Sequence, residues 1–291
     1  MTHQTASITD AAAAKLCQNG AALQPIRSER RHVMTHAPSA HEAAARVLYD
    51  ARTRGRPLAA LPAECRPANV DDALAIQRRV GELVAQPVGG WKCSVPTAAR
   101  PVAAAPIFAP TIHSASPWPV PGGGPLAKVE PEIAFVLARD LPARATPYGD
   151  DEIRAAVREA RLVLELIGAR YVDPAAVTYP ELLADGIANR GLYVGPVLPD
   201  PWTRTLEAFP IAVTRGGAAF ATRDGKHPDG HPLRPLYWLA NYLAARGDHL
   251  RAGQVVTTGS YCGVVEVPLG EPLAFAYGDL GTLAVTLGHG A

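Results

Sequence analysis

Residues 129–135 read Val-Glu-Pro-Glu-Ile-Ala-Phe, with two carboxylates placed two positions apart. Side chains alternate between the two faces of a β-strand, so in a strand Glu130 and Glu132 point to the same side. Val129, Ile133 and Phe135 then share the opposite side. The segment therefore predicts a strand with one apolar face and one acidic face.

A third carboxylate, Glu165, lies inside the apolar run at residues 162–167. A run that is apolar on both sides is typical of a fully buried strand. An isolated buried carboxylate is unfavourable because it loses its hydration or must be protonated, and convergence of three carboxylates on a hard divalent cation would remove that cost. The alternatives are a solvated strand face for the first two and a buried ion pair of Glu165 with Arg161 or Arg170.

The chain has 291 residues, of which 48% are hydrophobic, and this is enough for a sizeable core. It carries 28 Lys and Arg against 27 Asp and Glu, so no basic surface for nucleic acid is expected. No apolar stretch reaches the length of a membrane span. We expect neither nucleic acid nor a membrane as a partner.

The four cysteines, Cys17, Cys65, Cys93 and Cys262, show no spacing typical of a metal or redox site. No secretory signal precedes them, so we expect free thiols and a cytoplasmic location. Residues 1–38 look like an N-terminal extension, which we expect to be mobile or to form a short helix. Residues 39–291 then form a single domain.

Two helices are predicted ahead of the strands. Ser39 is a good N-cap for a helix over residues 40–53, and Asn69 for one over residues 70–85. Further helices are expected at two later segments, residues 150–160 and 235–245. Strands are expected at residues 90–94, 128–137, 162–167, 191–197, 211–215, 254–258, 272–276 and 281–287. This order is not a regular βαβ alternation, so it predicts an α+β fold.

Several segments occur in an order that resembles a known family. They are Gly90-Trp91-Lys92, Val129–Phe135, Leu164-Glu165-Leu166, Arg170-Tyr171, Asp185–Asn189, Trp238–Asn241, Leu250–Gly253 and Thr258-Gly259-Ser260. Together they resemble the 2-keto-4-pentenoate hydratase and 4-oxalocrotonate decarboxylase family of the fumarylacetoacetate hydrolase superfamily. The resemblance covers residues 40 to 288. It implies a mixed β-sheet roll of the fumarylacetoacetase C-terminal-like type, with N-terminal and peripheral helices.

The resemblance also implies a site. Glu130, Glu132 and Glu165 match the carboxylates with which the family holds Mg²⁺ or Mn²⁺, and the family substrate is a 2-oxo acid that chelates the open metal positions. Lys92 would stabilise developing negative charge or move a proton. We expect Ser260 and Asn189 to donate hydrogen bonds to the substrate.

The resemblance implies a metal-dependent lyase, foremost a hydratase of 2-hydroxy-2,4-dienoates in aromatic catabolism. The alternatives are a 4-oxalocrotonate decarboxylase, an acylpyruvate hydrolase, and a non-catalytic relative that binds a 2-oxo acid or supports a partner enzyme of the pathway. Relatives oligomerise, so we expect a homo-oligomer. The chain departs from the family where an aspartate is implicated in proton transfer, because Ile107 is aligned with it.

Overall fold

The computed structural model describes residues 39–122 and 124–290, and these residues belong to one compact unit. The extension predicted for residues 1–38 lies outside the described residues. Within the described part, no helix is long and apolar enough to cross a membrane. Cys65, Cys93 and Cys262 are free thiols, as expected, and Cys17 lies outside the described residues.

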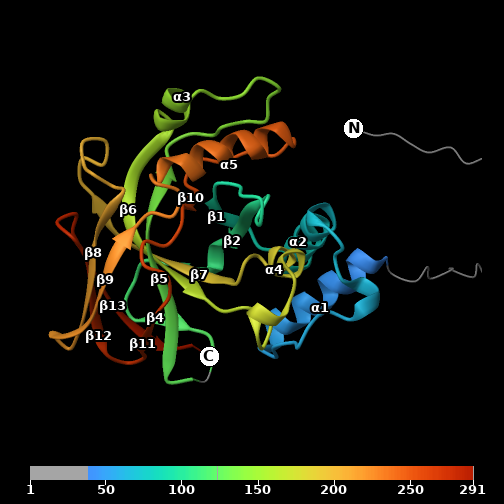
Figure 1. Cartoon of the computed structure of the whole chain (residues 1–291), viewed down its shortest axis with the longest axis horizontal. Helices are drawn as coiled ribbons and strands as arrows, with labels where there is room; N and C mark the ends of the chain where they lie inside the picture. Colours follow the sequence, from blue (N-terminus) through green and yellow to red (C-terminus); the bar gives the residue numbers. More distant parts are fainter. Residues whose placement is uncertain (1–38, 123, 291) are drawn as a thin grey trace, which may run out of the picture. The chain divides into compact units, whose positions relative to one another are not determined.

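The larger sheet has eight strands in the order β2-β1-β10-β5-β6-β7-β3, and β11 pairs with β5 beside β10. Its strands are β1 (Val88–Ser94), β2 (Ala103–Phe108), β3 (Ile112–His113), β5 (Leu126–Leu137), β6 (Val157–Ile167), β7 (Asn189–Leu198), β10 (Val255–Thr257) and β11 (Val265–Pro268). The pairs β1–β10 and β3–β7 are parallel and the others antiparallel, so the sheet is mixed. The predicted α+β class with a mixed sheet is confirmed (Figure 1).

A second sheet has five strands in the order β4-β13-β12-β8-β9. They are β4 (Trp118–Val120), β8 (Ala208–Arg215), β9 (Ala218–Lys226), β12 (Pro272–Tyr277) and β13 (Thr282–His289). The main core includes the apolar face of β5, with Val129, Ile133 and Phe135 fully buried in one cluster with Phe275 and Leu283 of the second sheet. Burial of this face fixes the acidic face of β5 on the opposite side.

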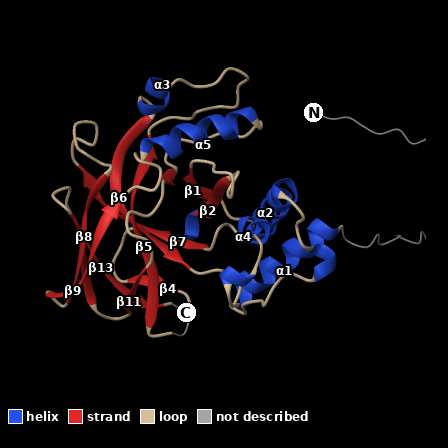
Figure 2. Ribbon diagram, viewed as in Figure 1, coloured by secondary structure: helices blue, strands red, loops and turns tan. Residues whose placement is uncertain are grey.

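Helices α1 (Ala40–Arg54), α2 (Val70–Val84) and α4 (Tyr179–Ala184) pack around a separate apolar cluster, on the right of Figure 2. The predicted caps are confirmed, because Ser39 accepts from the backbone N–H of Glu42 and Asn69 from that of Asp72. The helix predicted over residues 235–245 is also confirmed, as α5 (Leu233–Ala245).

The helix predicted over residues 150–160 is wrong in its second half. Helix α3 covers only Asp150–Arg154, and β6 begins at Val157. There Val157 pairs with Leu137 and Ala160 pairs with Phe135 of β5. Pairing with a long neighbouring strand outweighs the local helix preference of an alanine-rich segment.

The edge of β5 is shared by two strands, and the gap between them shapes the site. Strand β10 pairs with residues 134–136 of β5 and β11 with residues 126–129. The connecting loop crosses the gap, where the N–H of Tyr261 donates to the carbonyl of Pro131 at 3.1 Å. The N–H and C=O of one strand residue point to the same side of the strand. The nitrogen of Pro131 therefore faces this gap, where no neighbouring strand needs a backbone donor, and proline is tolerated there.

Candidate active site

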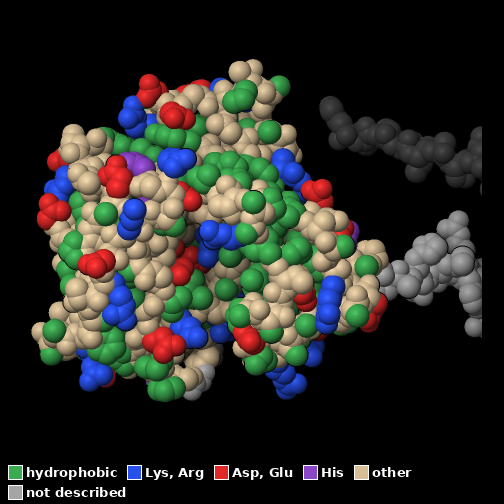
Figure 3. Space-filling model, viewed as in Figure 1, with side chains coloured by type: hydrophobic (Ala, Val, Ile, Leu, Met, Phe, Trp, Pro, Cys, Tyr) green, Lys and Arg blue, Asp and Glu red, His purple; other side chains and the backbone are tan. Residues whose placement is uncertain are grey.

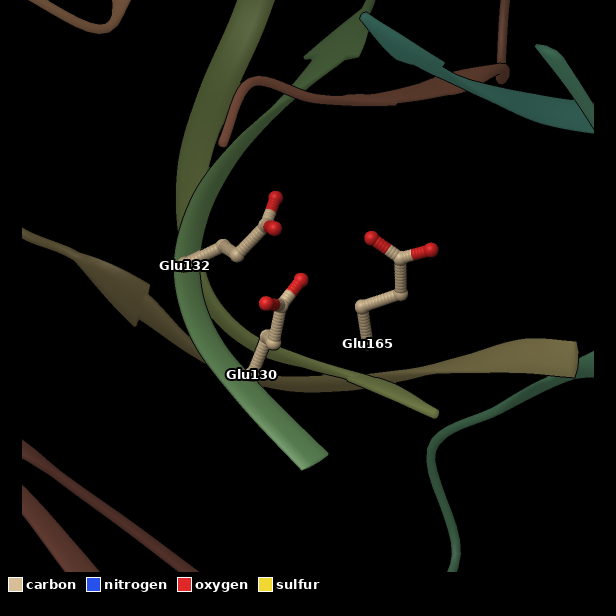
Figure 4. A group of neighbouring side chains, drawn as sticks. All are labelled: Glu130, Glu132 and Glu165. Carbon is tan, nitrogen blue, oxygen red and sulfur yellow. The ribbon is translucent and has the colours of Figure 1, made fainter. Parts of the chain in front are cut away.

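Strands β5 and β6 bring the three predicted carboxylates together. Glu130 lies directly opposite Glu165 in the antiparallel register, and Glu132 follows on the same face. One oxygen from each carboxylate lies within 4.8 Å of the others, and Figure 4 shows the three side chains pointing toward one another. Like charges that lie opposite each other destabilise a sheet, so this arrangement requires compensation.

Burial of the carboxylates makes compensation of their charge more necessary. Glu165 is fully buried and Glu132 is 2% exposed. Burial, with the charges of Glu165 and Glu130 adding to it, raises the pKa of Glu132 to about 8. Burial and the charge of Glu165 also raise the pKa of Glu130. One oxygen of Glu165, Oε2, is buried with no hydrogen-bond partner among the described residues.

Lys92 is the cation that faces this cluster. It lies on β1, and its Nζ is 2.7 Å from Oε1 of Glu165 and donates to the carbonyl of Ile187 at 3.1 Å. Burial alone would lower the pKa of Lys92, but the charges of the three glutamates outweigh it and the pKa is raised. Lys92 is therefore a protonated ammonium, and one positive charge faces three carboxylates.

The donor set fits a hard divalent cation. All three side chains offer carboxylate oxygens, the ligands that Mg²⁺ and Ca²⁺ prefer, and no His or Cys of the described part of the chain belongs to the cluster. The unpartnered oxygen of Glu165 and the raised pKa values of Glu130 and Glu132 show that Lys92 alone leaves the cluster under-compensated. The cluster could hold a divalent metal ion.

The loop after β10 orients Glu132. Thr257, the last residue of β10, donates its hydroxyl to Oε2 of Glu132, and the backbone N–H of Gly259 donates to the same oxygen at 3.0 Å. Gly259 has φ of 121°, a conformation that other residues rarely adopt, and a Cβ there would lie 3.1 Å from the ring of Pro228. The backbone can approach Glu132 in this way because Gly259 has no side chain.

Asn189 and Ser260 lie in different surroundings. Asn189 is buried at the start of β7 and donates its amide to Oε1 of Glu165 at 2.8 Å. Ser260 lines the same cavity as Lys92 and Glu132, and its hydroxyl contacts the carbonyl of Gly263 at 3.2 Å. Asn189 is thus a direct partner of Glu165, and the substrate contacts of both residues stay predictions.

A cavity of about 440 Å³ opens over the acidic face of β5. Lys92, Glu130 and Glu132 line its inner part, and Arg100 and Tyr179 line it as well. In the space-filling view, acidic and basic side chains lie beside a hollow near the middle of the molecule (Figure 3). A larger cavity of about 520 Å³ lies beside α2 and α5 and contains none of the three glutamates. The smaller cavity is therefore the candidate active site.

Ile107, which stands where the family has an aspartate, lies in the core and not in the cavity. Ile107 is fully buried in a core cluster with Val136 and Val163, and it does not line the cavity. The residue of β2 that lines the cavity is Ala103. Strand β2 therefore presents a methyl group to the cavity and no carboxylate.

Sequence reasoning missed Thr257, Arg100 and Tyr179. The parallel register places Thr257 beside Lys92, a non-local pairing that leaves no local sequence signal. His227 is the histidine next to the cavity residue Pro228, but it is 1% exposed and does not line the cavity. Its Nδ1 accepts from the N–H of Asp229 at 3.2 Å, and burial lowers its pKa to about 4, so the ring is neutral.

Comparison with known proteins identifies the family. No family model matches the chain. Over 248 residues the chain is 31% identical to the 2-keto-4-pentenoate hydratase of Paraburkholderia xenovorans, which spans 80% of this chain and 90% of that protein. The chain belongs to the 2-keto-4-pentenoate hydratase family. The resemblance seen in the sequence is thereby confirmed.

Two solved structures share the fold of this hydratase-family chain. The 4-oxalocrotonate decarboxylase of Pseudomonas putida, determined with magnesium and adipate, matches with a TM-score of 0.67 at 21% identity and covers 87% of this chain and 99% of that one. A yeast fumarylacetoacetate hydrolase family protein matches with a TM-score of 0.50 at 15% identity and covers 68% of this chain and 92% of that one. These likenesses confirm the predicted fumarylacetoacetase-like fold.

Proposed function

We propose that this protein is a divalent-metal-dependent hydratase that converts a 2-hydroxy-2,4-dienoate of the 2-keto-4-pentenoate type to a 4-hydroxy-2-oxo acid. The observation that carries the proposal is the buried cluster of Glu130, Glu132 and Glu165 beside Lys92, in a chain of this hydratase family. The acidic cluster is the part that could bind a metal, and Mg²⁺ is the ion we propose, with Mn²⁺ as the alternative.

The reaction adds one water molecule. The enol proton at carbon 2 is lost while carbon 5 gains a proton, and this step forms a conjugated 2-oxo acid. The hydroxyl of water then adds at carbon 4 and its proton at carbon 3. A bound divalent ion would supply Lewis-acid polarisation of the 2-oxo group.

The side chains of the cavity have distinct proposed roles. Glu130, Glu132 and Glu165 hold the ion, and Asn189 and Thr257 fix the orientation of two of these carboxylates. The ammonium of Lys92 stabilises negative charge that develops on the substrate oxygen at carbon 2.

We propose that Ser260, which lines the cavity, turns its hydroxyl from the carbonyl of Gly263 to the substrate carboxylate and donates a hydrogen bond to it. Strand β2 contributes no acid, and we propose that Lys92 or water supplies the protons at carbons 3 and 5.

One observation favours a second candidate, decarboxylation of a 4-oxalocrotonate-like diacid. The guanidinium of Arg100 forms no ion pair with any of the described residues, and Arg100 lines the same cavity as Lys92. Arg100 is an exposed side chain, and a second substrate carboxylate in the cavity would offer its guanidinium a charged partner. Hydrolysis of an acylpyruvate and binding of a 2-oxo acid without turnover are the remaining alternatives from the sequence.

An absorbance assay separates these functions. The purified chain with Mg²⁺ is expected to consume 2-hydroxypenta-2,4-dienoate, and EDTA should abolish the loss of diene absorbance. Parallel assays with 4-oxalocrotonate and an acylpyruvate report decarboxylation and hydrolysis. Binding of all three compounds without turnover would contradict the proposal and favour a non-catalytic relative.

We also propose that the protein is a homo-oligomer, and that it works beside an enzyme that supplies its dienoate. The support for the first statement is the family membership established above. A stable assembly would protect the large apolar side chains that the described part exposes, such as Trp202, which is 46% exposed.

A further inference from the structure

A third cavity, smaller than the two described above, lies apart from the candidate active site. Its volume is about 180 Å³, and it shares no lining residue with the cavity over the three glutamates. Three arginines line it, Arg52 from α1, Arg170 from the segment after β6, and Arg190 from β7. Among the residues that the structure describes, no acidic side chain lines it. We call it the arginine cavity.

Only one of the three guanidinium groups is fully paired. Arg170 forms a buried ion pair with Asp185, and it also donates to the carbonyls of Gly168 at 2.8 Å and Asn189 at 2.7 Å. Asp185 is paired directly with Arg170 and forms no ion pair with Arg52 or Arg190, although its charge acts to raise the pKa of both.

Arg52 and Arg190 lack a carboxylate partner. Arg52 reaches only the backbone carbonyl of Asp185, at 3.5 Å, and lies over the ring of Phe108. Arg190 forms no ion pair or side-chain hydrogen bond with the residues that the structure describes, although its stem packs tightly against Gly168. Two guanidinium groups thus face one cavity with most of their donors unused.

The surroundings make these free charges costly. Burial, with the nearby charge of Arg170 adding to it, lowers the pKa of Arg52 to about 9, and the same two causes lower that of Arg190. Arginine keeps its charge in proteins, so the cost is relieved by an anion and not by loss of a proton. Planar guanidinium groups bind the oxygens of phosphate and carboxylate in a bidentate manner.

We propose that the arginine cavity binds a compact oxyanion, a phosphate or carboxylate group, between Arg52 and Arg190. The size of the cavity supports a small ligand, because drug-sized ligands occupy cavities of roughly 300–1,000 Å³. Phe108, which is buried, and Pro110, which is exposed, give the cavity two apolar walls.

The test measures stability and binding and does not depend on catalysis. Thermal unfolding is followed while inorganic phosphate or acetate replaces chloride at constant ionic strength. We expect a saturable rise in melting temperature, and calorimetry should show one phosphate or acetate bound per chain. The better of the two anions identifies the oxyanion class.

Variants locate the anion. Arg190→Gln should weaken phosphate or acetate binding by roughly tenfold or more, and Arg52→Gln serves as the second variant if the first does not fold. Arg215→Gln is the matched control, because Arg215 is an exposed partner of Glu271 on the second sheet. Arg170 is left intact since it also holds Asn189.

Lys92→Met distinguishes the two cavities. This variant should keep the full response to phosphate or acetate if the anion sits between Arg52 and Arg190. The proposal is overturned if the wild-type protein shows no saturable response, if Arg190→Gln and Arg52→Gln bind the anion as the wild type does, or if Lys92→Met abolishes binding. None of these outcomes bears on whether the protein is a hydratase.

Discussion

Among the residues of the site, Lys92 is the one whose substitution should reduce turnover without reducing metal binding. Lys92→Met keeps much of the stem and deletes the charge that faces Glu165 at 2.7 Å. We expect turnover of the dienoate to fall by roughly 10²–10⁴-fold, the range for a positioned acid–base group. Calorimetry should show that Mg²⁺ still binds.

Lys128→Met is the matched control for Lys92→Met. Lys128 lies on the same sheet, is exposed and pairs with Glu266 at 3.6 Å. Its variant should turn over the dienoate at the wild-type rate. Equal rates for wild type and Lys92→Met would assign Lys92 a structural role.

Glu132 makes the metal-free protein sensitive to pH. Its pKa is raised to about 8 in the folded state, so between pH 4.5 and 8 the folded protein binds a proton that the unfolded chain has released. The contribution of Glu132 to stability is present below this window and lost as the pH rises through about 8. Melting temperatures in EDTA should therefore fall across this range, and Mg²⁺ should reverse the fall at pH 8.

The same proton must leave when the metal binds, so Mg²⁺ affinity should increase up to about pH 8. Calorimetry in buffers of different ionisation enthalpy counts the released protons. Affinity that is flat between pH 6 and 8 would contradict the raised pKa of Glu132.

The carboxylates were predictable from the sequence residue by residue, but their partners were not. The two-residue spacing of Glu130 and Glu132 fixes a common face in any strand, and the apolar surroundings of Glu165 predict its burial. The burial of Ile107 was not predictable, since the alanine- and proline-rich stretch before it offers no periodic pattern. Ala103 could be placed in the cavity only through the pairing of β2 with β1.

At the scale of elements, the loop between β10 and β11 is the part most sensitive to substitution. Gly259→Ala would put a Cβ 3.1 Å from Pro228 and strain a backbone with φ of 121°. Strain of this kind costs about 1–3 kcal/mol, and displacement of the loop would remove the N–H that orients Glu132. We expect a melting temperature lower by several degrees and weaker Mg²⁺ binding.

Gly263→Ala is the control within the same loop. Gly263 also has positive φ, 70°, but a Cβ there meets no atom within 4 Å. It should lose some stability and keep its affinity for Mg²⁺. If the two variants bind Mg²⁺ equally well, the close approach at Gly259 does not position Glu132.

Most elements with a strong local sequence pattern were predicted. The elements that were missed or misassigned depend on pairing with distant segments. The capped helices α1 and α2 and the long strand β5 follow from capping and alternation. The second half of the predicted 150–160 helix became strand because β5 offered a partner along its whole length. The edge strand β9, with largely exposed side chains, gave no hydrophobic signal.

At the scale of the whole molecule, the fold was predicted from the resemblance to a family. Neither the position of β10 between β1 and β5 nor the division into two sheets follows from local sequence, because both depend on pairing between distant segments. The assembly state follows neither from the local sequence nor from the fold of one chain.

We expect a homo-oligomer. One chain has a mass of 30.6 kDa, and light scattering on the eluting protein should return a whole multiple of this mass. Dilution should not dissociate it at micromolar concentration if the interface is of the obligate kind. A mass of one chain would refute the prediction and would leave the catalytic proposal untouched.

The central claim is that Glu130, Glu132 and Glu165 together hold a divalent ion, and titration calorimetry with Mg²⁺ tests it most directly. Wild-type protein should bind one Mg²⁺ per chain, and Glu165→Gln should bind it at least roughly 10–100-fold more weakly. Glu266→Gln, an exposed carboxylate on β11, should bind Mg²⁺ like the wild type. Absence of Mg²⁺ and Mn²⁺ binding to the wild type, or equal Mg²⁺ affinity of wild type and Glu165→Gln, would contradict the account.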